Sequence, residues 1–371
     1  MNILQLRGEF SDNGPGTQAL TISEELKARG HNIIFCSSGG KLTNKILNKE
    51  YDYRIIKELA LGKRNLFNVI LAIFKLSIII KKDNIDLVHT HNAASVFLAR
   101  IAALLVFKKL KIFQSVRGVE VRKNYKWRNW IYRINKFNAL FAVSEFTKKT
   151  LVSFGVDSNK IIVTYNGTDL SRFDISKKEM YNKEIRKEFN IPLSAKIIGI
   201  IGRQDGYKGH RHLIHVLKKL YNKYKNLYVV LVGEGTELIS NKNLAKELKV
   251  NDRAIFAGLR LDAERFHASF DIFTLLSKKG LEMFPNVIIE AMSYKNTFVA
   301  TNTTGVPETA KNGEGFICEC DDLECFVSKF DLLLSNDILR KDMGKKGRTS
   351  VENIFNIKEV VNKIEKAYLS M

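Results

Sequence analysis

The chain has 371 residues, a formal net charge of +21 at pH 7 and a hydrophobic content of 45%. This length exceeds what one hydrophobic core usually supports, and the composition excludes a disordered or low-complexity protein, so two domains of ordinary size are expected. The four cysteines lack the spacing of a zinc site, and we expect them to be reduced thiols and expect no metal site. They are Cys36, Cys318, Cys320 and Cys325.

Runs rich in Val, Ile and Leu alternate along the chain with helical patterns, which is typical of βαβ units and of an α/β fold with parallel sheets. The first such run leads into a glycine-rich turn at residues 13–17. A later run ends in the histidine-containing segment 86–91. Such segments mark strand ends, where ligands of parallel α/β sheets bind.

Most of the net positive charge lies in residues 1–175, and two segments stand out there. Residues 63–82 are apolar between basic ends but too short for a membrane span, so a buried helix of the first domain is expected. In residues 122–134, a helical stripe of aromatic and aliphatic side chains is surrounded by Lys and Arg, which suits an anionic bilayer surface. The alternatives are a core stripe and a nucleic-acid-binding segment. The stripe consists of Trp127, Trp130, Ile131 and Ile134.

Residues 172–195 carry charge without apolar periodicity, and we expect the hinge between domains there. The predicted N-terminal domain is 1–175 and the predicted C-terminal domain is 190–355. The amphipathic pattern of residues 356–371 predicts a final helix.

A β-branched run ends in the glycine-rich loop 202–209, which leads into a helical pattern at 213–220. Arg203 and Lys208 lie in this loop. Arg supplies a planar fork for phosphate oxygens and Lys a point charge, which suits a diphosphate. Because loops after parallel strands gather at one sheet edge, these cations and the loop of Glu282 are expected to face the same crevice.

Glu282 precedes, and Glu290 follows, a helix start predicted near Pro285. The first N–H groups of that helix, predicted over residues 284–287, would make an anion site. The two carboxylates could accept hydrogen bonds from hydroxyl groups that flank the anion, as in a sugar nucleotide. The alternative is that both glutamates are ordinary helix caps. The predicted anion-site residues are Phe284, Asn286 and Val287.

Taken in chain order, these segments resemble a retaining glycosyltransferase of family 4. The resemblance covers nearly the whole chain, and its segments are 13–17, 30–31, 86–91, 142–144, 161–169, 202–209, 232–235, 256–258, 282–290 and 304–308. It implies the GT-B architecture, in which two Rossmann-like domains face each other across a central cleft. It also implies that the C-terminal helix crosses back to the first domain; the alternative is a helix that ends its own domain.

The resemblance implies roles for the site residues. Arg203, Lys208 and the helix start would hold the leaving diphosphate, Glu282 the transferred sugar and Glu290 the ribose. Backbone N–H groups around Gly14 and Gly16 would approach the phosphate or sugar from the other domain. Retention would follow from front-face attack, in which the departing phosphate takes the acceptor's proton. The nucleotide sugar would be a substrate, and no cofactor is expected.

One position departs from the family pattern. Where many members carry a His-Gly pair, this chain has Arg117 and Gly118. Arg117 could contact a charged donor or acceptor, or it could pair with Glu120. His91 either contacts the substrate or is a structural residue at a strand end.

The sequence therefore predicts transfer of a sugar from a nucleotide diphosphate to a lipid-linked or membrane-borne glycan acceptor in surface polysaccharide synthesis. We expect a cytoplasmic protein, peripheral on the cytosolic face, that binds an anionic membrane surface and no nucleic acid. One alternative is a GT-B sugar-nucleotide epimerase, which would use acidic residues and histidines to move a proton. Another is a non-catalytic basic protein that binds membrane or nucleic acid.

Overall fold

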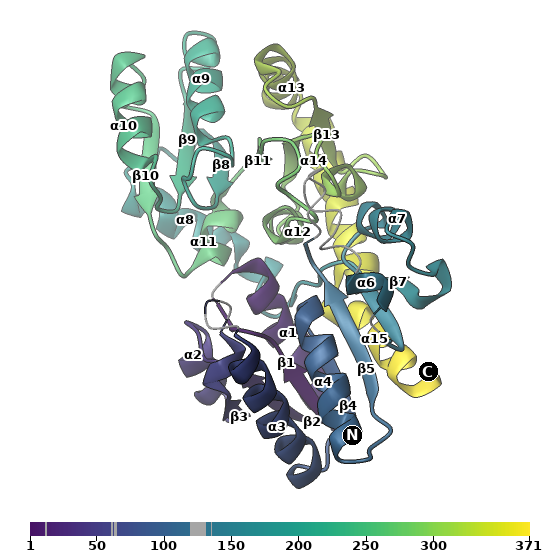
Figure 1. Ribbon diagram of the computed structural model, residues 1–371. Helices are drawn as coiled ribbons and strands as arrows, with labels where there is room; N and C mark the ends of the chain where they lie inside the picture. The colour runs from purple at the N-terminus through teal and green to yellow at the C-terminus, as the bar shows by residue number, and fades with distance from the viewer. Residues whose placement is uncertain (12, 61, 63–64, 119–130, 135) are drawn as a thin grey trace. The chain divides into compact units, whose positions relative to one another are not determined.

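The computed structural model describes residues 1–371 apart from 12, 61, 63–64, 119–130 and 135. The chain forms two compact units (Figure 1). Unit 1 comprises Met1–Gly167 and Ile357–Met371, and unit 2 comprises Thr168–Asn356. Each unit is built on one parallel sheet, of seven strands in unit 1 and six in unit 2, which confirms the predicted α/β class.

The unit 1 sheet has the order β3-β2-β1-β4-β5-β6-β7. Its central strands are buried on both faces, as near-continuous apolar runs predict for parallel sheets. The strands are β1 (Asn2–Leu6), β2 (Asn32–Ser37), β3 (Asp52–Ile55), β4 (Leu87–Thr90), β5 (Lys111–Val116), β6 (Ala139–Ala142) and β7 (Ile161–Val163). The helices are α1 (Gly14–Ala28), α2 (Thr43–Leu47), α3 (Leu66–Lys82), α4 (Ala93–Leu105), α6 (Ile131–Ile134), α7 (Glu145–Ser153) and α15 (Ile357–Ser370).

The strand order of unit 1 reverses between β1 and β4, which lie side by side with Leu6 opposite Thr90. The carboxyl end of each central strand is therefore followed by a loop at the same edge. In parallel α/β sheets, ligands bind at such a switch point. Arg7 follows β1, His91 follows β4 and Arg117 follows β5 at this edge.

Helix α15 packs within unit 1. Its apolar face joins a core with residues of β1, α1 and β5, including Ile3, Leu20 and Phe113. The hydroxyl of Tyr368 and Nδ1 of His89 on β4 share a hydrogen bond of 2.6 Å. Glu365 bonds Arg29 at 2.9 Å and His31 at 2.7 Å. Helix α15 thus belongs to the core of the first unit although it follows the second in sequence.

The unit 2 sheet has the order β10-β9-β8-β11-β12-β13 and reverses between β8 and β11. The strands are β8 (Lys196–Ile201), β9 (Leu227–Val232), β10 (Ala254–Gly258), β11 (Ile272–Leu275), β12 (Thr297–Thr301) and β13 (Gly315–Cys318). The helices are α8 (Lys178–Glu188), α9 (His210–Leu220), α10 (Leu238–Glu247), α11 (Ala263–Ser269), α12 (Asn286–Ser293), α13 (Leu323–Ser335) and α14 (Asp337–Ser350).

Residues 172–195, predicted to contain the hinge, include helix α8, which packs on α11. Arg265 of α11 pairs with Glu184 of α8 at 2.9 Å. The helix carries few apolar residues, and only Ile185 and Arg186 on it are buried. Because this helix is mostly charged, its sequence lacks the apolar periodicity that would have predicted it. The segment is part of unit 2.

Helix α3 is not the buried helix that residues 63–82 predicted. One face is buried through residues such as Leu76 and Ile80, but the opposite face is apolar as well. The exposed apolar side chains on that face are Leu66, Phe67, Ile70, Phe74 and Ile78. No helix in the described part of the chain has the length and apolarity that a membrane span requires.

The aromatic stripe predicted in residues 122–134 falls partly outside the described residues. Trp127 and Trp130 belong to the segment 119–130, which the structure does not describe.

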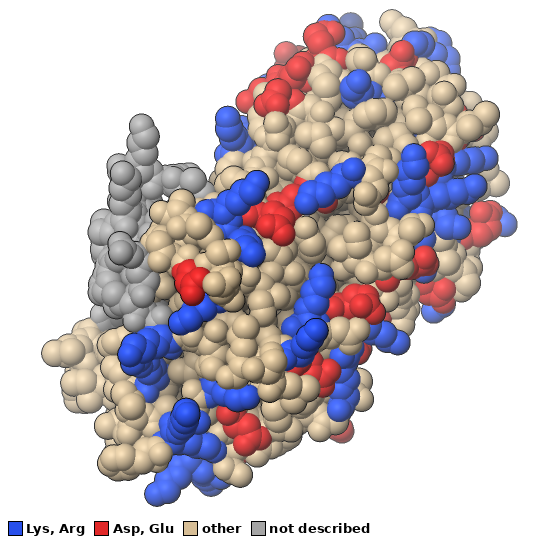
Figure 2. All heavy atoms as spheres, turned by 90° about the vertical axis from the view of Figure 1, so that its right-hand side faces the viewer, with Lys and Arg blue, Asp and Glu red and all other residues tan. Residues whose placement is uncertain are grey.

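On the face drawn in Figure 2, basic and acidic side chains are interspersed over most of the surface. The high net charge is therefore not gathered into one patch on this face.

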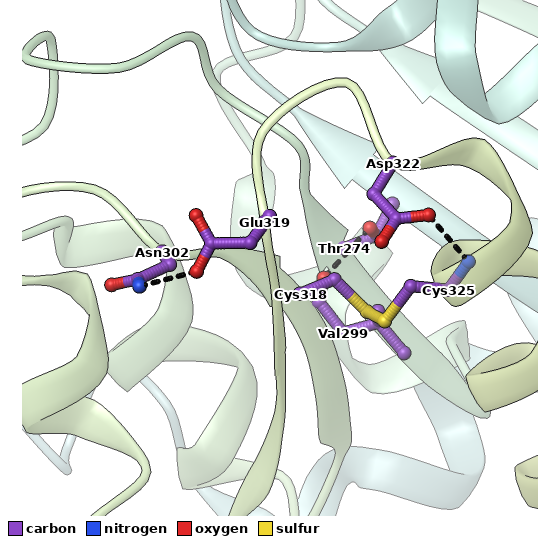
Figure 3. Close-up of a disulfide and its surroundings, with 7 residues drawn as sticks. All are labelled: Thr274, Val299, Asn302, Cys318, Glu319, Asp322 and Cys325. Carbon is purple, nitrogen blue, oxygen red and sulfur yellow. Dashed lines mark hydrogen bonds between the residues drawn. A yellow bond between two sulfur atoms is a disulfide. The ribbon is translucent and has the colours of Figure 1, made fainter.

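The expectation of four reduced cysteines is wrong for one pair. Cys318 at the end of β13 and Cys325 in α13 form a disulfide, with Cα atoms 6.0 Å apart (Figure 3). The side chain of Asp322 caps α13 by accepting from the backbone N–H of Cys325 at 2.9 Å. Cys36 and Cys320 are free thiols. The spacing of seven residues gave no signal, because a helix start brings these cysteines together.

Candidate active site

Two loops meet at the switch point of the unit 2 sheet, one after β8 and one after β11. Gly209, which precedes α9, has a positive φ of 90°. A Cβ atom at this position would lie 2.5 Å from the carbonyl oxygen of Leu276. Glycine adopts this positive φ without strain and has no Cβ atom to clash with Leu276. Its presence therefore allows the two loops to be in direct contact.

Lys208 and Glu282 form an ion pair across this contact. Nζ of Lys208 donates to Oε1 of Glu282, and Ser277 Oγ donates to the same oxygen at 3.0 Å. The side chains of Lys208 and Glu282 are only 20% and 9% exposed. The structure thus brings together two of the predicted site residues. An ammonium carries three donors, so Lys208 can hold Glu282 and a ligand oxygen at once.

Arg203 lies in the same loop but has different partners. Its guanidinium pairs with Asp205 at 2.9 Å and donates to the Tyr207 hydroxyl at 3.3 Å. The side chain is 74% exposed. Arg203 is therefore a solvent-accessible cation whose present contacts are local, and it does not bond the Lys208–Glu282 pair.

Helix α12 begins at Asn286, with Pro285 as its N-cap residue and no side chain capping it. Neither Glu282 nor Glu290 caps the helix, which removes the capping alternative. The first N–H groups of the helix, at Asn286 and Val287, are of the kind that binds anions. Oδ1 of Asn286 is buried and has no hydrogen-bond partner.

Glu290 in α12 and Phe284 just before this helix lie against protein neighbours. Oε2 of Glu290 lies 3.4 Å from Nε2 of His267, whose ring is fully buried in α11. Phe284 is buried, and its ring centroid is 5.4 Å from that of Phe355. Glu290 thus lies beside a buried histidine whose ring nitrogens have no hydrogen-bond partner, while Phe284 anchors the loop before α12.

In unit 1, Gly14 and Gly16 lie at the start of α1. The side chain of Asn13 caps this helix by accepting from the N–H of Gly16 at 3.0 Å. A Cβ at Gly16 would lie 2.1 Å from the carbonyl oxygen of Ser11. The glycine is therefore required by the turn itself, and the structure brings the start of α1 close to Arg7, whose Nη1 would be 3.1 Å from that Cβ.

His91 stacks on His89 with ring centroids 4.7 Å apart, and its Nε2 lies 2.7 Å from Oε1 of Gln5. Burial lowers the pKa of His91 well below its usual range. Burial also lowers the pKa of His89 to about 3, and His89 bonds Ser115 at 2.8 Å. His89 is a core residue with partners on both ring nitrogens, whereas Nδ1 of His91 is buried and has none.

Arg117 donates to Oδ1 of Asn166 through Nη1. Its Nε and Nη2 atoms are buried and have no hydrogen-bond partner. Burial, and then the nearby Arg7, lower the pKa of Arg117. The alternative pairing with Glu120 falls on a residue outside those described.

Several residues at these sites were not predicted. Ser277 donates a hydrogen bond to Glu282, and His267 lies beside Glu290. Asn166 accepts from Arg117, and Arg7 adds a second cation in unit 1. For Arg7 and Ser277, the available signal was their position just after the central strands of each sheet. No sequence signal indicated His267. Asn166 lies in the family segment 161–169, but its pairing with Arg117 was not predicted, because it joins elements far apart in the chain.

Two parallel α/β sheets, each with polar residues gathered at its switch point, define the GT-B class of glycosyltransferase folds. A solved structure of a glycosyltransferase from Rickettsia africae ESF-5 matches 99% of this chain and 97% of its own, with a TM-score of 0.86 and 25% identity. Residues 12–172 match the family model Glycosyltransferase Family 4, and residues 182–350 match Glycosyl transferases group 1. The chain belongs to this family of glycosyltransferases and is a hexosyltransferase-type enzyme.

Two relatives cover most of the chain. The N-acetyl-alpha-D-glucosaminyl L-malate synthase of Bacillus anthracis is 26% identical over 368 residues, which are 96% of this chain and 94% of that protein. The UDP-Gal:alpha-D-GlcNAc-diphosphoundecaprenol alpha-1,3-galactosyltransferase of Escherichia coli is 27% identical over 316 residues, covering 81% and 79%. The epimerase and the non-catalytic basic protein are therefore not retained as interpretations.

Proposed function

We propose that this protein transfers a sugar from a nucleotide-diphosphate donor to a lipid-linked glycan acceptor in surface polysaccharide synthesis, with retention of the anomeric configuration. The observation that carries the proposal is the Lys208–Glu282 pair, held at the unit 2 switch point by Gly209 and Ser277. A half-buried cation beside a buried carboxylate that follows a parallel strand suits a ligand with both phosphate and hydroxyl groups.

Each proposed role follows from charge. Breaking the bond between the anomeric carbon and the phosphate oxygen builds negative charge on the diphosphate. Lys208, the exposed Arg203 and the N–H groups of Asn286 and Val287 would stabilise that charge. Glu282 would accept hydrogen bonds from the transferred sugar, and Glu290, which lies beside His267, from the ribose. In unit 1, N–H groups around Gly14 and Gly16 would face the phosphate or sugar.

Retention would follow from attack on the same face that the leaving group departs from. The acceptor oxygen bonds the anomeric carbon as the bond from that carbon to phosphate breaks, and the acceptor's proton passes to the departing phosphate oxygen. This step needs no general base from the protein, which is consistent with Glu282 being engaged by Lys208 and Ser277.

A membrane-borne acceptor is supported by the surface of α3. Its exposed face carries Leu66, Phe67, Ile70, Phe74 and Ile78, and neither α3 nor α4 contains an acidic residue. Lys81, Lys82 and Lys109 lie exposed near the helix ends. An apolar face with basic neighbours suits an anionic lipid surface. The E. coli relative is named for a lipid-linked diphosphate acceptor, whereas the B. anthracis relative is named for L-malate.

The donor is tested by a thermal-shift panel of UDP, GDP and ADP. One of the three should raise the melting temperature, since ligand at about 100 times its Kd adds about 2.7 kcal/mol to stability. Lys208→Ala should reduce that shift. With the donor of the matching base, the anomeric signal of the product in NMR should show the donor's configuration. An inverted product, or no stabilisation by any nucleotide, would overturn the proposal.

A further inference from the structure

Three nitrogen-bearing side chains lie at the carboxyl ends of neighbouring strands in unit 1. Arg7 follows β1, His91 follows β4 and Arg117 follows β5. The backbone N–H of His91 bonds the carbonyl of Leu6 at 3.0 Å, and Thr90 lies opposite Gln114 on β5. The three residues thus share the edge at which the sheet reverses its strand order.

Arg117 presents an unused donor edge. Asn166 accepts from Nη1, which fixes the plane of the guanidinium. The free atoms, Nε and Nη2, form the side of the fork that binds a carboxylate or phosphate with two parallel hydrogen bonds. Both atoms are buried, so bulk water does not supply their missing hydrogen bonds.

The surroundings of Arg117 add positive charge rather than neutralising it. Arg7 lowers the pKa of Arg117, and Arg117 and Arg7 are among the groups that lower the pKa of His91. Glu9 acts electrostatically on Arg7 and partly offsets the effect of its burial, but among the described residues no carboxylate forms an ion pair with Arg7 or Arg117. A guanidinium stays charged, and a buried charge without a partner is strongly destabilising. Since buried polar groups normally have hydrogen-bond partners, the unpartnered atoms of Arg117 require a partner that the described residues do not supply.

We infer that Arg117 and Arg7 bind an oxyanion, a carboxylate or a phosphate, carried by the acceptor in unit 1. The inference rests on the proposed function, whose acceptor it specifies. His91 adds a hydrogen-bond acceptor to this site. Its imidazole is neutral, and when Nε2–H donates to Gln5, Nδ1 is left as an acceptor. An acceptor with a hydroxyl and an oxyanion on the same molecule satisfies all of these atoms.

The test uses the full chain carrying Arg203→Ala and Lys208→Ala, which removes the two cations of unit 2. Inorganic phosphate, pyrophosphate and succinate are titrated by calorimetry at constant ionic strength, because salt screens weak anion binding. At least one of these anions should bind, and the preferred one separates a phosphate-bearing from a carboxylate-bearing acceptor. Adding Arg117→Gln should weaken binding at least tenfold, and Arg7→Gln should weaken it in the same direction. Arg100→Gln, which removes a unit 1 charge from α4, is the matched control and should leave binding unchanged.

Thermal stability without ligand separates a binding role from a structural one. If Arg117 awaits a ligand, Arg117→Gln should melt at the same temperature as the parent or higher, because an unpaired buried charge is removed. Failure of all three anions to bind, or equal binding by the Arg117→Gln and Arg7→Gln proteins, would overturn the inference. The nucleotide panel reports on unit 2, so it can succeed while this inference fails.

Discussion

Lys208 and Glu282, which are 74 residues apart in sequence, are joined by a hydrogen-bonded ion pair that Ser277 completes. The carboxylate is the more buried partner, and its charge depends on the lysine for compensation. This dependence distinguishes Lys208 from Arg203, although both are cations of one loop.

Replacement of either cation should impair transfer, but only one should affect folding. Lys208→Ala and Arg203→Ala should each reduce kcat/KM by more than tenfold, about 1.4 kcal/mol of transition-state stabilisation. Lys208→Ala should also lower the free energy of unfolding by roughly 1–3 kcal/mol, because buried Glu282 loses its cation. Arg203→Ala should not, because its side chain is 74% exposed. Steady-state kinetics and urea denaturation measure the two effects, and wild-type kinetics in both variants would reject the assignment.

The two glutamates should differ in kinetics. Glu282→Gln should chiefly lower kcat, because its proposed contact is with the reacting sugar, whereas Glu290→Gln should chiefly raise the donor KM. Initial rates over a range of donor concentrations separate the parameters. Equal small effects on both parameters in both variants would mean that neither carboxylate contacts the donor.

The exposed face of α3 should hold the protein on anionic membranes. Phe67→Ser/Phe74→Ser should reduce co-sedimentation with vesicles containing anionic lipid, since each ring loses apolar burial in the bilayer interface. Ile239→Ser, at an equally exposed apolar position of unit 2, is the control and should bind as wild type does. Binding should weaken at high salt. Equal sedimentation of wild type and the Phe variant would show that this face does not contact lipid.

Unit 1 should lose stability in mild acid. Burial lowers the pKa of His89 to about 3, from 6.5, and that of His91 well below 6.5. The unfolded chain therefore binds protons that the folded chain excludes, and stability present above pH 6.5 is lost as the pH falls toward 3. The slope should approach about 1.4 kcal/mol per pH unit for each histidine. Urea denaturation at pH 7, 6 and 5 measures it, and His89→Gln/His91→Gln should flatten the slope; an identical slope in this variant would contradict the assignment.

The disulfide should leave two free thiols. Thiol titration of the denatured, unreduced protein should detect Cys36 and Cys320 only. In the native protein Cys36 should be unreactive, since burial raises its pKa to about 12. Cys325→Ser should lower the free energy of unfolding by about 2 kcal/mol through the entropy of a short closed loop. Four titratable thiols under denaturing conditions would show that the pair is reduced.

The sequence was most informative at glycine and proline, because each of these residues favours a particular backbone conformation. The glycine at 209 indicated a turn, and the structure shows a positive φ there. Pro285 indicated a helix start, and α12 begins at the next residue. The order of parallel strands predicted that Lys208 and the Glu282 loop face one crevice, and the ion pair between them confirms it. Nothing in the sequence linked Arg117 to Asn166. The exposed face of α3 was missed because a helix that is apolar all round looks buried in its sequence.

The position of α15 has a consequence for synthesis on the ribosome. The second unit is complete in sequence before α15 is made, and domains generally fold as they emerge. The first unit, although its strands are translated first, lacks Tyr368 and the other buried residues of α15 until that helix has been made. Unit 2 can therefore finish folding before unit 1, whose apolar surface over β1 and β5 stays uncovered during translation and is the part most in need of chaperones.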